Sequence, residues 1–169
     1  MLMKEKIVKL LKKYTKHDYI ELTSKGDNAI FAALCCAKKI NNKKSVLTAE
    51  QGGWFSYLKY PKKLGFKLEL AETDYGVIDL GDLRKKMQNK NFCALIYANP
   101  AGYFAEQPIK EIYEACKKNN CLVILDASGS IGSELCNGEY ADIIVGSFGK
   151  WKPVNLGYGG FLSAKEKKY

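Results

Sequence analysis

Seven short apolar runs, each of strand length, recur along the chain and restrict its fold more than any other feature. They are YIELT (19–23), SVLTA (45–49), FKLEL (66–70), FCALIYA (92–98), CLVILD (121–126), ADIIVGS (141–147) and YGGFLSA (158–164). Helical patterns separate most of the early runs, and near-continuous apolar strands that alternate with helices are typical of a mainly parallel sheet covered on both faces. The sequence therefore predicts an α/β fold with three layers, α/β/α, around a mainly parallel seven-stranded sheet.

Two helical patterns, at residues 28–40 and 107–118, are expected to face the core. Each carries apolar residues on one side and stops at a pair of asparagines. The apolar positions are Ile30, Ala33, Leu34 and Ala37 in the first pattern and Ile109, Ile112, Tyr113 and Cys116 in the second.

The first 17 residues are basic and amphipathic. Ile7, Leu10, Leu11 and Tyr14 follow the i, i+3, i+4, i+7 spacing of one helix face, so residues 1–17 are expected to form an N-terminal helix docked on a single domain of residues 1–169. The segment lacks the apolar stretch and cleavage site of a signal peptide. Since no apolar run approaches the roughly 20 residues of a membrane helix, we expect no membrane span.

The formal net charge of +9 raises the question of a nucleic-acid partner. Arg84 is the only arginine, and the lysines are spread along predicted helix faces. A nucleic-acid-binding protein would gather arginines and aromatic residues on one face. We therefore interpret the lysines as solvated and expect no nucleic acid.

The six cysteines contain no CxxC pair, and several lie inside apolar patterns. Buried free thiols are expected, which indicates a reducing compartment and a cytoplasmic protein. His17, the only histidine, lies in a polar stretch and is predicted to be a surface residue. Metal sites and Ser/His/Asp catalysis are therefore poorly supported.

Polar residues gather at the ends of the predicted strands, where a mainly parallel sheet binds its ligand. The candidates are Lys25, Gly26 and Asp27 after 19–23, Trp54 after 45–49, Asn99 after 92–98, Asp126 at the end of 121–126, and Ser147, Lys150 and Lys152 at or after the end of 141–147. We expect Asn99-Pro100 to form a turn.

Pyridoxal 5'-phosphate is a cofactor that needs this combination of groups. A lysine amine forms a Schiff base with it, a carboxylate keeps its ring nitrogen protonated, and a planar group lies against its ring. Its phosphate binds at a helix N-terminus with small residues and a hydroxyl. The sequence therefore predicts a pyridoxal phosphate site at this edge of the sheet.

From Thr23 to Ala164 the chain resembles the fold-type-I pyridoxal phosphate enzymes, and within them the DegT/DnrJ/EryC1/StrS sugar-aminotransferase-like family. KGDNAI is similar to the family's S-G-T-A-A-L phosphate loop, and LDASGSIG to its E-D-A-A-Q-x-x-G segment. SFGKWKPVNLGYGG is similar to its S-F-x-x-x-K segment, which a glycine cluster follows.

The resemblance implies a role for each matched residue. Asp126 would pair with the pyridine nitrogen, and Trp54, placed by counting back from the family's glycine at 65, would stack on the ring. Ser147 and the backbone amides of Gly26 and Asp27 would hold the phosphate.

Two positions depart from the family pattern. Asp27 stands where Thr or Ser is usual, and Gly129 replaces a glutamine. A carboxylate beside a phosphate dianion is unfavourable unless it turns away or caps the helix.

Lys150 and Lys152 are both candidates for the Schiff-base lysine. In an extended segment residues i and i+2 point to the same side, so direction does not separate them. The family interval counted from Ser147 selects Lys152, whereas the Ser-x-x-Lys interval of the cysteine desulfurases selects Lys150. We prefer Lys152, because the glycines that follow it match the family.

Family members are usually much longer, with a small C-terminal domain that closes over the substrate. We expect this chain to be the large domain without the small one, working as a homodimer or with a partner chain that supplies the C-terminal domain. The resemblance implies aminotransferase-like activity on a small-molecule substrate. Arg84 offers no clear clamp for an amino acid's carboxylate, which favours a keto-sugar or related carbonyl. The alternative is a non-catalytic truncated homologue, acting as a binding or scaffold subunit or as half of a split enzyme.

Overall fold

The computed structural model describes residues 3–89, 91–102 and 104–169. The helices are α1 (Met3–Thr15), α2 (Gly26–Ile40), α3 (Phe55–Lys63), α4 (Leu80–Asn89), α5 (Ile109–Lys118) and the 3-10 helix η1 (Gly138–Tyr140). The strands are β1 (Tyr19–Thr23), β2 (Ser45–Ala49), β3 (Lys67–Ala71), β4 (Thr73–Asp74), β5 (Val77–Ile78), β6 (Phe92–Ala98), β7 (Leu122–Asp126), β8 (Ile143–Ser147) and β9 (Gly160–Ala164).

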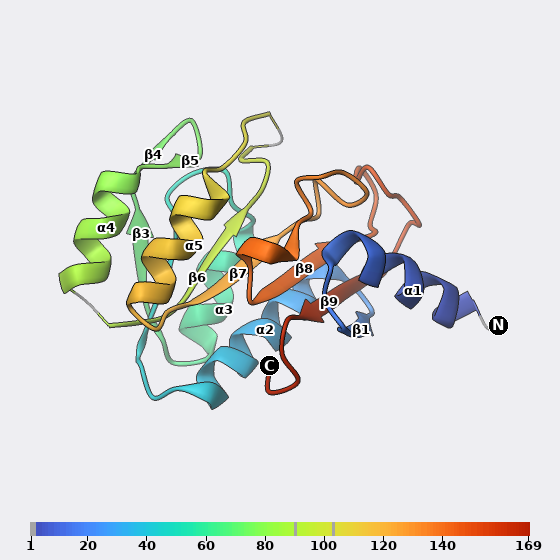
Figure 1. The fold of residues 1–169 in the computed structure, drawn as a ribbon, viewed down its shortest axis with the longest axis horizontal. Helices are drawn as coiled ribbons and strands as arrows, with labels where there is room; N and C mark the ends of the chain where they lie inside the picture. The colour runs from blue at the N-terminus through green and yellow to red at the C-terminus, as the bar shows by residue number, and fades with distance from the viewer. Residues whose placement is uncertain (1–2, 90, 103) are drawn as a thin grey trace.

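Seven strands form one sheet in the order β1-β9-β8-β7-β6-β2-β3 (Figure 1). The strands from β8 to β3 in that order pair in parallel, whereas β9 pairs antiparallel with both β8 and β1. The mainly parallel seven-stranded sheet is thus confirmed. Strands β4 and β5 form a separate two-stranded ribbon. The sequence did not predict it, because two residues per strand are too few to show an alternating pattern.

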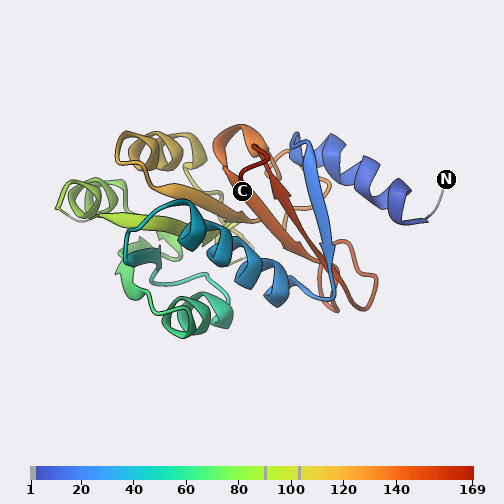
Figure 2. The same cartoon turned by 90° about the horizontal axis from the view of Figure 1, so that it is seen from below.

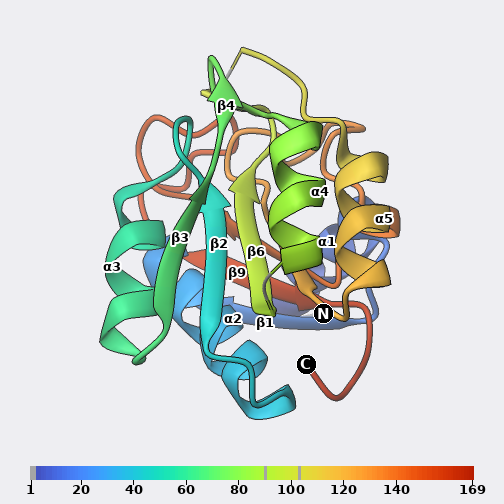
Figure 3. The ribbon, with the colours of Figure 1, turned by 90° about the vertical axis from the view of Figure 1, so that its left-hand side faces the viewer.

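Alternate side chains of the central strands enter two different apolar layers. Along β7, Val123 and Leu125 belong to a cluster that includes residues of α4 and α5, whereas Leu122 and Ile124 belong to a cluster with α2 and α3. Figure 2 shows α2 and α3 on one side of the sheet and α5 on the other, and Figure 3 shows α4 beside α5. The predicted three-layer α/β/α arrangement is confirmed.

Helix α1 packs on the antiparallel side of the sheet, against β1 and β9. Leu11 is buried and Ile7 partly buried against the core. Leu10 and Tyr14 are exposed. The apolar face of α1 is therefore only partly covered within this chain.

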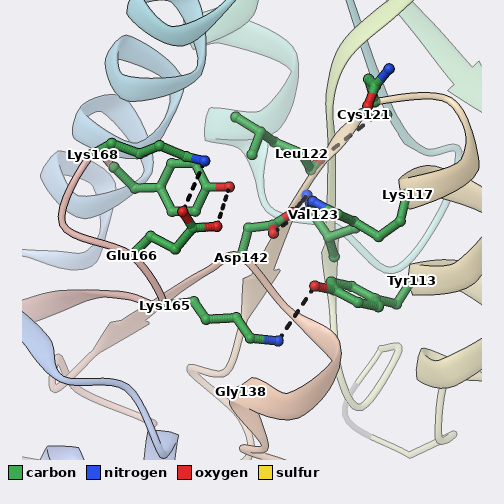
Figure 4. Close-up of polar contacts among 12 residues, drawn as sticks. Tyr113, Lys117, Cys121, Leu122, Val123, Gly138, Asp142, Lys165, Glu166 and Lys168 are labelled. Atoms are coloured by element: carbon green, nitrogen blue, oxygen red, sulfur yellow. Dashed lines mark hydrogen bonds and ion pairs between the residues drawn. The ribbon is translucent and has the colours of Figure 1, made fainter.

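Asp142 joins two strands and a helix at the amino end of β8. Its buried carboxylate accepts hydrogen bonds from Lys117 Nζ of α5 and from the backbone N–H of Val123 on β7, both at 2.9 Å (Figure 4). Its own carbonyl accepts from the N–H of Lys165, just after β9. Burial would lower the pKa of Lys117, but the hydrogen bond and charge of Asp142 outweigh it and raise that pKa.

The prediction that His17 is a surface residue is wrong. Its ring is buried, with Nε2 3.2 Å from the Gly138 carbonyl oxygen and Nδ1 3.1 Å from Ser163 Oγ. A carbonyl oxygen only accepts, so we assign the neutral ring's proton to Nε2, and Nδ1 accepts from the Ser163 hydroxyl. The neighbours of His17 in sequence are polar. Its burial arises from η1, which is distant in sequence and packs on the ring.

Three chain segments meet closely beside the carboxyl end of β8, and glycines make this possible. A Cβ added to Gly26 would lie 2.7 Å from Ser147 Cβ, and one added to Gly160 would lie 2.6 Å from the Gly26 nitrogen. Real Cβ atoms do not approach other atoms so closely, so the start of α2 rests directly on β8 and β9. This contact brings the N-terminus of α2 next to Ser147.

The buried His17 predicts a loss of stability in mild acid. Burial lowers its pKa from the usual 6.5, so below pH 6.5 the unfolded chain binds a proton more readily than the folded chain. The contribution of His17 to stability is therefore complete above that pH and falls as the pH decreases toward the lower folded-state value. Urea unfolding at about pH 7.5 and 5.5 should show a decrease in the free energy of unfolding, and a smaller decrease in His17→Gln. Equal decreases in both proteins would contradict the assignment.

The contact between α2 and β8 predicts that Gly26 does not tolerate a side chain. Gly26→Ala should lower the free energy of unfolding by about 1–3 kcal/mol, because its methyl group overlaps Ser147. Gly81→Ala in the first turn of α4 is the matched control, since its Cβ would meet only the Asp79 side chain, at 3.1 Å. Chemical unfolding of both variants measures the difference. Equal stability would contradict the tight contact.

Candidate active site

A cavity of about 130 Å³ opens at the edge where the parallel strands end. A cavity needs roughly 10–15 Å³ to hold one water, so this one admits a small organic group. Its walls come from the segments that follow β1, β2, β6, β7 and β8. The lining residues are Lys25, Gly26, Asp27, Ile30, Gly52, Gly53, Trp54, Tyr57, Ala98, Pro100, Asp126, Ser128, Gly129, Ser147 and Lys152.

Most of the residues selected from the sequence meet in this cavity. Those that line it are Gly26, Asp27, Trp54, Asp126, Ser147 and Lys152. Lys150 is exposed and is not among the lining residues. These six residues thus bring four separate segments of the chain to one small volume.

Asp126 is the buried carboxylate of the site, at the last position of β7. Tyr57 donates its hydroxyl to Asp126 Oδ2 at 2.7 Å, and the backbone N–H of Ser128 donates to Oδ1 at 2.8 Å. Both donors are neutral. Each carboxylate oxygen has two lone pairs and can accept about two hydrogen bonds. Each oxygen of Asp126 accepts one in these two contacts, so the carboxylate can accept a further hydrogen bond from a cationic N–H in the cavity.

The two lysines of the loop after β8 lie differently, because that segment is not extended as assumed from the sequence. The N–H of Lys152 donates to the Gly149 carbonyl at 3.3 Å, which closes a turn with Lys150 and Trp151 at its centre. Trp151 has φ 69°, in the left-handed region. The turn therefore separates the directions of the two lysines, and Lys152 is the one that reaches the cavity wall.

Lys152 lies over an aromatic ring at the cavity wall. Its Nζ is 5.2 Å from the centroid of the Trp54 ring, within range of a cation–π interaction. The Trp54 side chain is 56% exposed. One face of its ring is therefore occupied by the ammonium group while much of the indole remains open to solvent.

Ser147 and the start of α2 form a polar corner of the cavity. The Ser147 Oγ accepts from the N–H of Gly149 at 3.2 Å, which leaves its proton to donate. The first N–H groups of an α-helix have no partner within the helix, and the helix dipole adds positive potential there. This corner therefore suits an anionic group.

Asp27 lies in the same first turn and is turned toward α3. Its Oδ1 accepts hydrogen bonds from the Ser56 hydroxyl and from Trp54 Nε1, the latter at 3.1 Å. These donors hold the carboxylate and fix the indole ring at the same time. Asp27 thus links the start of α2 to the N-terminus of α3.

Tyr57 was missed by the sequence reasoning, although it is fully buried and touches the key carboxylate. The residue predicted from this part of the sequence was Trp54, which was placed by counting back from Gly65. The available signal was the position of Tyr57, one helical turn after Trp54, where a side chain of α3 can reach the end of the neighbouring strand.

Asn99 supports the loops around the cavity, without lining it itself. Its Oδ1 accepts from the N–H of Gln107 at 2.9 Å, and its Nδ2 donates to the Leu135 carbonyl at 3.4 Å. The predicted bend at Asn99-Pro100 is present, and Pro100 lines the cavity. Asn99 therefore fixes the positions of two loops.

Within residues 3–89, 91–102 and 104–169, no group of three or more His, Cys, Asp or Glu side chains is placed to hold a metal ion. None of the helices in these ranges has the length and apolar character to cross a membrane.

Solved structures share this fold over almost the whole chain. The ntda protein of Bacillus subtilis, solved with bound cofactor PMP, is 19% identical with a TM-score of 0.80, over 97% of this chain and 37% of that one. An apo cysteine desulfurase from Thermococcus onnurineus NA1 is 22% identical with a TM-score of 0.76, over 96% and 42%. An aminotransferase from Psychrobacter cryohalolentis is 16% identical with a TM-score of 0.76, over 97% and 42%. This chain thus spans less than half of each of these proteins.

Sequence comparison gives a more specific result. None of the curated proteins matches the chain. The model of the DegT/DnrJ/EryC1/StrS aminotransferase family matches residues 4–168, which is nearly the full length. The chain belongs to the DegT/DnrJ/EryC1/StrS aminotransferase family.

Proposed function

We propose that the chain binds pyridoxal 5'-phosphate in this cavity, through Lys152, for aminotransferase-like chemistry on a small carbonyl substrate such as a keto-sugar. The family and the shared fold support this cofactor. The observation that carries the proposal is that Asp126 at the end of β7, Ser147 at the end of β8 and Lys152 in the loop after β8 line one cavity.

The residues present fit the cofactor. Because Gly26 has no side chain, the start of α2 lies directly against Ser147, and the first amides of the helix and the Ser147 hydroxyl are together at one corner of the cavity, where a phosphate can bind. Asp126 supplies a buried carboxylate whose two observed donors are neutral. Lys152 supplies an amine at the wall of the same cavity.

Each residue then has a distinct task. Ser147 and the amides of Gly26 and Asp27 would hold the phosphate, and Asp126 would hold the protonated ring nitrogen. Lys152 would hold the cofactor through its Nζ, and the same amine would move a proton. When bound, pyridoxal phosphate acts as an electron sink for the substrate. Trp54 is the candidate ring partner, because its contacts with Asp27 and Lys152 hold it at the cavity wall.

Exposed aromatic residues around the site support a partner there. Phe55 at the start of α3 and the loop residues Tyr75, Phe104, Trp151 and Tyr158 are exposed. Figure 3 shows β4 and the loops after β2 and β6 at the same end of the sheet. Exposed apolar groups of this kind are typical of an interaction surface. We propose that a second copy or a separate chain covers this edge and completes the site. The free thiols of all six cysteines support a cytoplasmic location.

A binding subunit without turnover is the second candidate function. Asp27 favours it, because a carboxylate in the phosphate corner weakens cofactor binding, and so does Gly129, which offers no side chain to the cavity. The two candidates differ in whether cofactor binding is followed by amino-group transfer.

The proposed function predicts different results for variants of Lys152 and Lys150. Pyridoxal phosphate added to the purified chain and fixed with borohydride should remain attached to Lys152, as peptide mapping by mass spectrometry would show. Lys152→Ala should abolish this attachment, whereas Lys150→Ala should retain it, because Lys150 lies outside the cavity. Attachment that survives Lys152→Ala and disappears in Lys150→Ala would reverse the assignment. Lack of attachment to the unaltered chain would refute the proposed function.

A further prediction concerns the negative charge of Asp27. Asp27→Asn keeps an oxygen that accepts from Ser56 and Trp54 but removes the charge that repels the phosphate. We expect the affinity for pyridoxal phosphate to increase roughly threefold, and the gain to shrink in high salt because charge repulsion is screened. Absorbance titration at two salt concentrations measures both effects. Weaker binding by Asp27→Asn would show that the charge of Asp27 supports the site.

A further inference from the structure

The contact between Tyr57 and Asp126 crosses from α3 to the end of β7. The Tyr57 hydroxyl donates to Asp126 Oδ2 at 2.7 Å, and both residues line the cavity. A buried tyrosine hydroxyl needs a hydrogen-bond partner, whereas phenylalanine would supply nearly the same apolar packing area without one. The position of the hydroxyl, on the carboxylate that faces the cavity, gives Tyr57 a use beyond packing.

A glycine makes room for the Tyr57 ring in this orientation. A Cβ added to Gly53 would lie 2.7 Å from Cδ2 and 3.0 Å from Cε2 of that ring. The backbone of Gly53 therefore lies against the Tyr57 ring, one step before the N-cap of α3. Because the φ of Gly53 is outside the left-handed region, alanine there would disturb the ring and not the local backbone.

Asp126 has a fixed direction as a result of its two donors. Ser128 N–H binds Oδ1 and Tyr57 binds Oδ2, so neither oxygen can rotate away without losing a charge-assisted hydrogen bond. The Ser128 donor is part of the backbone immediately after β7. The Tyr57 donor is a side-chain hydroxyl, so a substitution at position 57 can remove it.

We propose that Tyr57 is a positioning residue of the cofactor site: its hydroxyl, seated by Gly53, holds the Asp126 carboxylate in the direction that receives the ring nitrogen of pyridoxal phosphate. The inference rests on the proposed function. It adds Tyr57 to the site as a residue that acts through Asp126. It also explains why position 53 is a glycine, because a side chain there would displace the Tyr57 ring.

The test compares Tyr57→Phe and Gly53→Ala with Tyr60→Phe, a tyrosine of the same helix that does not line the cavity. In the cofactor-free proteins, the carboxyl ¹³C signal of Asp126, assigned by its loss in Asp126→Asn, should move in the first two variants and stay in the third. Pyridoxal phosphate should bind roughly tenfold more weakly to Tyr57→Phe, the usual cost of removing a hydrogen bond to a charged group. With ¹⁵N-labelled cofactor, the ring-nitrogen signal should shift toward the unprotonated position.

Each outcome decides the inference. Unchanged affinity and an unchanged ring-nitrogen signal in Tyr57→Phe would overturn it while leaving the proposed function intact. An unmoved Asp126 carboxyl signal would show that the hydrogen bond does not hold in solution, and would overturn it as well. If the unaltered chain binds no pyridoxal phosphate, the proposed function and the inference fall together. Thermal unfolding of all three variants identifies any that fails to fold. If Tyr57→Phe does not fold, the Asp126 carboxyl signal and the affinity for pyridoxal phosphate are measured in Gly53→Ala instead.

Discussion

The close approach of α2 to strands β8 and β9 is the constraint on which the site depends. Gly26 and Gly160 leave no room for side chains where these segments meet, with an added Cβ falling 2.6–2.7 Å from its nearest neighbour in both cases. The approach also joins the beginning and the end of the chain, because β1 pairs with β9 immediately beside it. This close packing places the N-terminus of α2 beside the Ser147 hydroxyl, and both line the cavity.

Two buried carboxylates at opposite ends of the sheet have different partners. This difference distinguishes a carboxylate that stabilises the fold from one that is suited to bind a ligand. Asp142, at the amino end of β8, is paired with the cation of Lys117 and the amide of Val123. Asp126, at the carboxyl end of β7, receives hydrogen bonds from the neutral groups of Tyr57 and Ser128. A buried charge is stable when it is paired. Asp142 has its counter-charge within the fold, whereas Asp126 lines a cavity and is suited to receive one from a ligand.

The seven-stranded sheet could be predicted from the sequence, but only part of the site could. The strand predicted at 121–126 and the helix predicted at 28–40 could be found because their apolar patterns are strong, and Asp126 could be selected because it ends such a strand. The burial of His17 depends on Gly138, which is distant in sequence, so no local pattern predicts it. The contact of Tyr57 with Asp126 joins α3 to β7, and the sequence around Tyr57 indicates only that it follows Trp54 by one helical turn. The directions of Lys150 and Lys152 depended on a turn with Trp151 at positive φ, a conformation that a tryptophan does not signal.

Trp54 contacts two oppositely charged groups of the cavity wall, the carboxylate of Asp27 and the ammonium group of Lys152. Its indole N–H is held by Asp27, and its ring face lies 5.2 Å from Lys152 Nζ. A negative group and a positive group therefore share one aromatic side chain, and the position of either one affects the other through it. Asp27 stands where the family pattern has Thr or Ser, and its carboxylate orients the aromatic wall of the cavity while it adds negative charge at the start of α2.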